Sequence, residues 1–279
     1  MSILITGASG QLGQELSHLL TERNIPFTGM DSEQLDITDS QVVQAYFDQE
    51  RPSFVFHCAA YTAVDAAEEE GKDLNWQVNV EGTRTIAEAS ERVGATLVYI
   101  STDYVFDGTS LEEYSEEAPV NPQNEYGRAK AAGEQLIQEV CSSYYIVRTS
   151  WVFGQYGQNF VYTMLKLAET RDQITVVGDQ FGRPTWTKTL AAFLLHLMET
   201  KPAYGIYQLS NEGSCSWFEF ASAILSDQPV NVQSIPSEEY PQKAYRPRHS
   251  VMDLRKAKQT GFSIPTWEEA LSMFLSNGS

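Results

Sequence analysis

The sequence predicts an α/β protein: a doubly wound parallel sheet with a smaller C-terminal α/β lobe. In the first half of the chain, short apolar runs alternate with amphipathic stretches, the pattern of repeated strand-helix-strand units. Beyond about Trp151 the elements are shorter, and Trp, Tyr, Pro and Arg are frequent in the turns. We expect a first domain at residues 1–153 and a lobe mainly at residues 154–279. The boundary is nominal, because later segments can return to the first domain's core.

A glycine turn follows the first predicted strand, Ile3–Thr6. Its pattern, Gly-x-x-Gly-x-x-Gly, differs from the Gly-x-Gly-x-x-Gly fingerprint, but it lies between a strand and a leucine-striped helix. Glycines let backbone N–H groups approach a pyrophosphate, and the helix N-terminus adds partial positive charge. We therefore predict a Rossmann-type NAD(P)-binding domain, with a plain strand-to-helix turn as the alternative. The expected cofactor contacts in this turn are Gly7, Gly10, Gln11, Leu12 and Gly13.

A second strand, residues 26–30, ends at Asp31. An acid at this position usually accepts hydrogen bonds from an adenosine ribose, and its charge disfavours a 2′-phosphate. We therefore expect appreciable use of NADH even if NADPH is also accepted. The alternative is that Asp31 caps or turns the following loop. Asp36, followed by Ile37, is a competing cofactor contact.

A third strand is predicted at residues 53–57, after a helix that Ser40 can cap. The small residues that follow would let the backbone approach the cofactor closely, and the expected contacts there are Ala59, Ala60 and Tyr61. A helix over residues 75–93 should then bring Asn79 towards the carboxyl edge of the sheet.

The fourth strand, residues 96–100, places Thr102 at its carboxyl end. After a long loop, Asn124 can cap a helix that carries Tyr126 and Lys130 on one face, because they are four residues apart. A free phenol has a pKa of about 10, and an ammonium within about 4–6 Å lowers it by roughly one to three units. Tyr126 could then exchange a proton. The alternative is a surface aromatic beside a solvated lysine.

Composition narrows the function classes. A formal net charge of −18 argues against a general nucleic-acid binder and gives meaning to any cluster of arginines that could receive an anionic ligand. Three widely spaced cysteines predict neither a disulfide framework nor a zinc site. We find no leader-like start and no apolar run of membrane-spanning length, so we expect a cytoplasmic protein that binds no membrane.

These motifs resemble the extended short-chain dehydrogenase/reductases and, more narrowly, the dTDP-4-dehydrorhamnose reductase family. The resemblance runs over nearly the whole chain and is carried by residues 61–65 (YTAVD), 101–108 (STDYVFDG), 148–153 (RTSWVF), 179–185 (DQFGRPT) and 246–250 (RPRHS). It implies an enzyme that uses NADPH or NADH to reduce the C4 ketone of dTDP-4-dehydro-6-deoxy-L-mannose to dTDP-L-rhamnose.

The resemblance also implies roles for residues. Tyr126 would donate a proton, Lys130 would lower the tyrosine's pKa and bind the nicotinamide ribose, and Thr102 would hold the carbonyl oxygen. Trp151 would line the hexose pocket, Asn159 would lie near the phosphates, and arginines would meet the diphosphate unless they form surface ion pairs. The expected substrate contacts are Thr102, Asp103, Tyr104, Tyr126, Trp151, Asn159, Arg183 and Arg246, with Arg248 as a further candidate.

Three further expectations accompany it. Some family members form a dimer bridged by magnesium held by glutamates; Glu15 resembles one ligand, but Thr187 and Lys188 stand where another is sought. We therefore predict no metal and a monomer or weak homodimer. The alternative functions are a nucleotide-sugar epimerase or dehydratase of the same superfamily, and a non-catalytic NADP-binding regulatory subunit.

Overall fold

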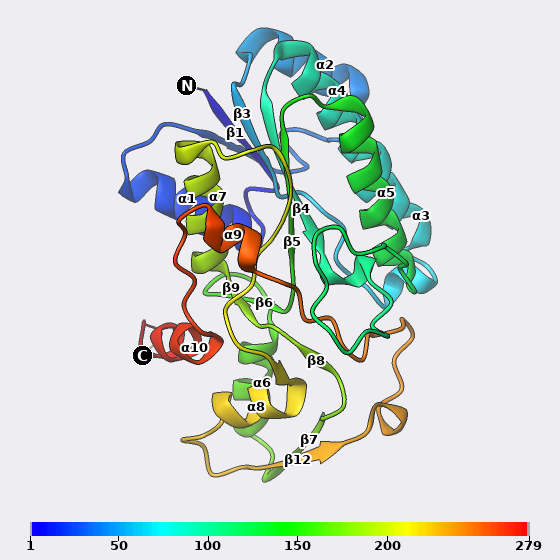
Figure 1. The fold of residues 1–279 in the computed structure, drawn as a ribbon, viewed down its shortest axis with the longest axis vertical. Coiled ribbons are helices and arrows are strands. Elements are labelled where there is room, and N and C mark those ends of the chain that lie inside the picture. The colour runs from blue at the N-terminus through cyan, green and yellow to red at the C-terminus, as the bar shows by residue number, and fades with distance from the viewer. Residues whose placement is uncertain (1, 278–279) are drawn as a thin grey trace.

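The computed structural model describes residues 2–277. At its centre is a six-stranded sheet in the order β10-β5-β4-β3-β1-β2, and every neighbouring pair is parallel (Figure 1). The predicted Rossmann-type sheet is confirmed. Its strands are β1 (Ile3–Thr6), β2 (Thr28–Met30), β3 (Phe54–His57), β4 (Thr96–Thr102), β5 (Tyr144–Thr149) and β10 (Gly205–Gln208).

Helices cover both faces of this sheet (Figure 1). Successive strand residues point to opposite faces, so on β4 Leu97 and Tyr99 pack in one apolar core and Val98 in the other. The first core lies under α2 (Ser40–Glu50), α4 (Thr83–Val93) and α5 (Glu125–Val140). The second lies under α1 (Gln11–Glu22) and α7 (Thr187–Thr200).

Two predicted helix starts were wrong. Asp39, not Ser40, caps α2, because its carboxylate accepts from the N–H groups of the second and third helical residues at 3.0 and 3.1 Å. The helix expected over residues 75–93 is divided into α3 (Lys72–Trp76), the π-helix η2 (Gln77–Gly82) and α4. In η2 the Asn79 side chain bonds both the N–H and the C=O of Tyr61, which holds the segment after β3 in place.

The lobe has its own apolar core, which contains Phe153, Trp186 and Phe220. Its paired strands are β6 (Val152–Phe153) with β9 (Thr185–Trp186), β7 (Gln173–Val177) with β12 (Asn231–Ile235), and β8 (Phe181–Gly182) with β11 (Cys215–Ser216). Its helices are α6 (Phe160–Ala168), α8 (Trp217–Ile224) and α10 (Trp267–Asn277), while α9 (Arg255–Gln259) lies near β10. Short turns of 3₁₀-helix occur at η1 (Ala66–Glu68), η3 (Asp103–Val105) and η4 (Ser237–Glu239).

The chain crosses between the two parts more than once. β10 pairs with β5 in the main sheet, and α7 packs on α1, although both elements follow residue 154. A division of the chain at residues 153 and 154 therefore stays a nominal prediction.

The carboxyl edge of the sheet meets the start of α5. Thr102 of β4 pairs with Thr149 of β5, and α5 begins at the predicted cap, Asn124, whose Oδ1 accepts from Gly127 N at 2.6 Å. The same amide donates to the carbonyl of Tyr245 at 2.9 Å, which ties the helix start to a C-terminal segment. No helix within residues 2–277 is long and apolar enough to cross a membrane.

Candidate active site

Polar groups from β4 and α5 converge at this edge. The buried hydroxyl of Thr102 accepts from Tyr104 N at 3.1 Å and donates to Asp103 Oδ1 at 3.1 Å. Tyr126 hydrogen-bonds with Thr102, and its ring lies edge-on to that of Tyr104 at 6.1 Å between centroids. The structure thus brings the predicted Thr102 and Tyr126 together.

The phenol of Tyr126 has a raised pKa. Burial is the main cause, the charges of Asp103 and Tyr104 add to the rise, and the hydrogen bond with Thr102 offsets part of it. The expected net lowering of this pKa beside Lys130 was wrong, because burial raises it. Tyr126 therefore keeps its proton at neutral pH, as a proton donor must.

Lys130 lies one helical turn further along α5 and is buried. Its Nζ lies 3.9 Å from the centroid of the Tyr99 ring, a cation–π contact that partly replaces lost hydration. Burial lowers the pKa of Lys130 to about 7, while Glu134 and Cys58 raise it. Lys130 can thus change charge near neutral pH.

Asp103 links this site to the C-terminal part of the chain. Its Oδ2 accepts from the hydroxyl of Ser250 at 2.6 Å, and the backbone N–H of Ser250 donates to Phe181 O. The side chain is nearly inaccessible, so burial raises its pKa to about 6, although hydrogen bonds from Ser250 and Thr102 oppose the rise. The end of β4 and the lobe therefore share one buried carboxyl group.

A cavity of about 330 Å³ lies over the glycine turn. Most predicted cofactor contacts line it, namely Gly7, Gly10, Asp31, Asp36, Ile37, Ala59, Ala60 and Tyr61. Gly7 has a φ of +68°, and a Cβ there would lie 2.6 Å from Ala59 N, so only glycine fits. The cavity is a backbone-lined cradle that suits a dinucleotide.

The other predicted contacts of the turn do not line this cavity. Gln11 donates from Nε2 to the carbonyl of Gln158 at 3.0 Å. A Cβ on Gly13 would lie 2.2 Å from Gly7 O, so this glycine lets α1 pack against the turn. Contacts of Gln11, Leu12 and Gly13 with a cofactor stay predictions.

The acids at the edge of the cavity also shape loops. Asp31 Oδ1 accepts from Glu33 N at 3.1 Å, and Asp36 Oδ1 accepts from Thr38 N at 2.9 Å. The turn-forming alternative for Asp31 is therefore present in the structure. It does not exclude a ribose contact, because Asp31 lines the cavity as well.

A second cavity, of about 460 Å³, lies between the lobe and Tyr104. Two predicted substrate contacts, Tyr104 and Arg246, line it, and the guanidinium carbon of Arg246 lies 5.6 Å from the Tyr104 ring centroid. Arg246 also pairs with Asp65 at 3.0 Å. The cavity therefore adjoins the ring that contacts Tyr126.

The structure does not bring the other two arginines to this cavity. Arg183 pairs with Glu113, and the exposed Arg248 pairs with Glu238. The surface ion-pair alternative thus describes Arg248, whereas Arg183 is buried where it pairs with Glu113. A diphosphate contact from Arg183 stays a prediction.

Trp151 and Asn159 have structural partners. The Trp151 indole stacks on Trp217, which lines the second cavity, at 3.5 Å between centroids. Asn159 caps α6 by accepting from Tyr162 N at 3.1 Å and donates to Gly154 O at 2.8 Å. Their contacts with a substrate stay predictions.

Comparison with known proteins decides the family. The family model described as "RmlD substrate binding domain" matches residues 1–279. The chain belongs to this family. It is 42% identical over 279 residues to a dTDP-4-dehydrorhamnose reductase of Streptomyces griseus, covering 96% of this chain and 91% of that protein. It is 41% identical over 279 residues to the spore coat polysaccharide biosynthesis protein SpsK of Bacillus subtilis, covering 99% and 98%.

A solved structure agrees. The dTDP-4-dehydrorhamnose reductase of Bacillus anthracis in complex with NADP is 45% identical, with a TM-score of 0.95 and 99% of each chain covered. The resemblance to dTDP-4-dehydrorhamnose reductases of the extended short-chain dehydrogenase/reductase superfamily is confirmed, and the chain is an oxidoreductase of this kind.

For this member of the RmlD family, the motifs missed several residues of the second cavity. Missed lining residues include Phe160, Met164, Arg171, Gln180, Trp217, Tyr240 and Gln242. Arg171 is the second arginine of the cavity and lies between α6 and β7. Arg171 could have been found from the sequence, because a positive charge in a short loop of an acidic chain suggests an anion-binding site. The apolar lining residues could not, because their pattern is the same as that of the apolar core of the lobe.

The predicted absence of a bridging metal stays a prediction. Glu15 is buried, and its Oε2 accepts from the hydroxyl of Thr187 at 2.9 Å. The Glu15 carboxylate is therefore hydrogen-bonded to Thr187 where α1 packs against α7.

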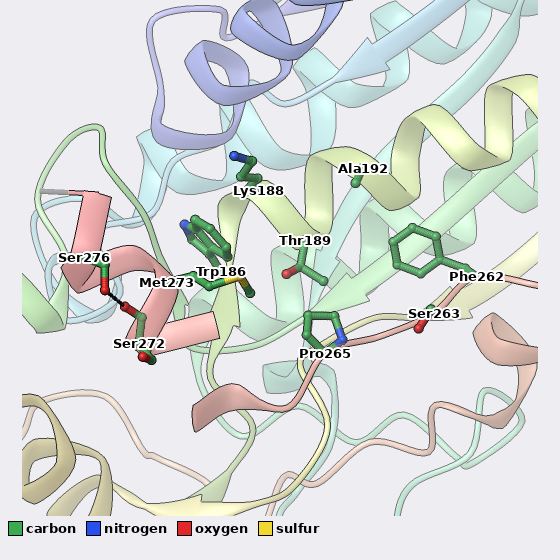
Figure 2. Close-up of a pocket in the computed structure, with 10 residues that line it drawn as sticks. All are labelled: Trp186, Lys188, Thr189, Ala192, Phe262, Ser263, Pro265, Ser272, Met273 and Ser276. Atoms are coloured by element: carbon green, nitrogen blue, oxygen red, sulfur yellow. Dashed lines mark hydrogen bonds between the residues drawn. The ribbon is translucent and has the colours of Figure 1, made fainter. Parts of the chain in front are cut away.

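A third cavity, of about 590 Å³, lies apart from the candidate site (Figure 2). Side chains from β9, α7, α10 and the loop before α10 line it, including Trp186, Thr189, Pro265 and Met273. It shares no lining residue with the other two cavities, so we assign it no part in the site.

Asp103 should make stability depend on pH. Its folded pKa of about 6 lies above the ordinary 3.8, so its favourable contribution is full below pH 3.8 and is lost as pH rises through 6. We expect the free energy of unfolding of the parent to fall relative to Asp103→Asn by about 3 kcal/mol across this range. Denaturant unfolding of both proteins at a series of pH values measures this difference. If the free energies of unfolding of the parent and of Asp103→Asn change in parallel with pH, the raised pKa of Asp103 is contradicted.

Proposed function

We propose that this chain reduces the C4 ketone of dTDP-4-dehydro-6-deoxy-L-mannose to dTDP-L-rhamnose, with NADPH or NADH as reductant. One observation carries the proposal. Tyr126 contacts Tyr104 of the second cavity, and Lys130 of the same helix acts electrostatically on Cys58 of the dinucleotide cavity. A proton donor at this position would lie between a cofactor in the first cavity and a sugar ligand in the second.

The residues around the first cavity fit a dinucleotide. The glycines and small side chains that line it, with Gly7 packed closely against the backbone of Ala59, leave room in which a pyrophosphate would fit. Asp31 and Asp36 would receive the adenosine ribose. When bound, the reduced nicotinamide supplies the hydride.

Tyr126 would supply the proton. As the ketone is reduced, negative charge develops on its oxygen, which becomes an alkoxide. An alkoxide is much more basic than a phenolate, since water itself has a pKa of about 15.7. Even with a raised pKa, the phenol of Tyr126 can therefore protonate this oxygen.

Thr102 and Lys130 would assist the transfer. The hydroxyl of Thr102 donates to Asp103, and it can instead donate to a carbonyl oxygen placed beside Tyr126. Lys130 would hold the nicotinamide ribose. Removal of the Thr102 hydroxyl should therefore lower turnover, whereas removal of the Lys130 ammonium should lower both turnover and cofactor affinity.

Two secondary expectations accompany the proposal. A nucleotide-sugar and a dinucleotide both diffuse freely in the cytoplasm, so we expect the protein to act there. We also expect it to be a monomer or a weak homodimer. Neither expectation is needed for the chemistry.

Tyr126→Phe tests the proton donor. The variant keeps the ring and its edge-on contact with Tyr104 but deletes the hydroxyl. We expect the protein to fold and bind NADPH while kcat falls by about 10²–10⁴-fold with little change in affinity. The assay follows loss of reduced-cofactor absorbance with dTDP-4-dehydro-L-rhamnose. A folded, cofactor-binding variant with the parental kcat would show that another group donates the proton.

Arg246→Met tests recognition of the diphosphate. Loss of one charged hydrogen bond costs roughly 1.5–3 kcal/mol, so KM for the sugar nucleotide should rise about tenfold or more. The dissociation constant of NADPH should not change. Arg248→Met is the matched control, because Arg248 is exposed and does not line the second cavity. Equal KM values in the two variants would remove Arg246 from the site.

A further inference from the structure

A buried ion pair lies beside the candidate site. Arg148 of β5 and Glu134 of α5 are both nearly inaccessible, with side-chain exposures of 2% and 3%. The guanidinium makes two parallel bonds to the carboxylate, Nε to Oε1 at 2.9 Å and Nη2 to Oε2 at 2.7 Å. This bidentate geometry fixes both side chains and is the arrangement in which a buried pair best offsets its desolvation.

The pair joins α5, which carries Tyr126 and Lys130, to β5, the strand beside the end of β4. Arg148 precedes Thr149, the register partner of Thr102, and its Nη1 donates to Glu116 O at 3.3 Å. Glu134 lies four residues after Lys130 and so shares its face of α5. The carboxylate therefore connects a fixed arginine on the sheet with the lysine of the site.

Lys130 has few other charged neighbours. From β3 and the residue after it, His57 and Cys58 face Lys130, and burial lowers the pKa of His57 to about 3 and raises that of Cys58 to about 12. From β4, Tyr99 has a raised pKa, as does Tyr126 on α5 itself. All four groups are uncharged at neutral pH. Asp103, from η3, raises the pKa of the Tyr126 phenol.

We propose that Glu134, held by Arg148, is a positioning residue that keeps the Lys130 ammonium charged at the active site. The inference rests on the proposed function for the role of Lys130 in turnover, but the electrostatic effect itself does not. Arg148 bonds both oxygens of the Glu134 carboxylate and so fixes its position, and the carboxylate favours the charged form of Lys130.

The consequence has a definite sign. Glu134 favours protonated Lys130, so its removal lowers the pKa of Lys130 below about 7 and leaves a neutral amine at neutral pH. If charged Lys130 is needed, activity is lost as pH rises through this pKa. The alkaline fall in kcat/KM should then begin at a lower pH in the variant.

The experiment titrates Lys130 directly. Protein labelled with ¹³C at the lysine ε-carbon is titrated by NMR without cofactor, and Lys130 is assigned by its missing signal in Lys130→Met. We expect Glu134→Gln to lower the Lys130 midpoint by about one pH unit or more. Glu139→Gln is the matched control on the exposed side of α5 and should not shift it. An unshifted midpoint in Glu134→Gln would overturn the proposal.

Further variants keep the test decisive. Glu134→Gln leaves Arg148 buried without its partner and could unfold, whereas Glu134→Gln with Arg148→Met leaves no unpaired charge and should fold. This double variant should also lower the midpoint, because the carboxylate is gone, and Arg148→Lys should largely retain the parental midpoint. A parental midpoint in the double variant would refute the role of Glu134.

The rate profile separates the two proposals. The alkaline limb of kcat/KM should move with the NMR midpoint. A midpoint that moves while the limb stays would leave the electrostatic role intact and contradict the proposed function of Lys130. A limb and midpoint that both stay would contradict the role of Glu134 alone.

Discussion

Burial of the Lys130 ammonium is the constraint around which the site is arranged. A charge removed from water needs compensation, and the chain supplies it from three elements: the Tyr99 ring on β4, the Glu134 carboxylate on α5, and Arg148 on β5, which fixes that carboxylate. Together these contacts fix α5 against the sheet edge, with the phenol of Tyr126 beside Thr102. Burial at this edge disfavours the charged form of Lys130 and, by raising the pKa of Tyr126, also keeps the phenol protonated.

The two parts of the chain meet through hydrogen bonds that involve the site itself. Ser250 bonds the carboxyl of Asp103, and Asn124 at the start of α5 bonds the carbonyl of Tyr245. The C-terminal segment that carries Arg246 is therefore attached to the groups that would do the chemistry.

Much of this architecture was predictable from local pattern. Apolar runs predicted the strands, and Asn124 and Asn159 were predictable caps because a side-chain oxygen preceded a helical stripe. Local pattern failed where tertiary contacts decided the outcome. Asp39, and not Ser40, caps α2. The expected single helix contains a π-helix in which Asn79 bonds Tyr61. The pKa of Tyr126 is set mainly by burial and not by a neighbouring charge on α5. The partners of Arg183 and Arg148 lie far away in sequence, so spacing could not reveal them.

In the proposed reaction, C4 of a nucleotide-linked sugar receives a hydride from the cofactor and its oxygen receives a proton from Tyr126. The most direct measurement uses reduced cofactor labelled with deuterium at the nicotinamide C4, with dTDP-4-dehydro-L-rhamnose as substrate and NMR of the sugar product. We expect one deuterium at C4 of the hexose and stoichiometric oxidised cofactor in solution. Deuterium at another carbon, or an unlabelled product formed without net cofactor oxidation, would contradict it.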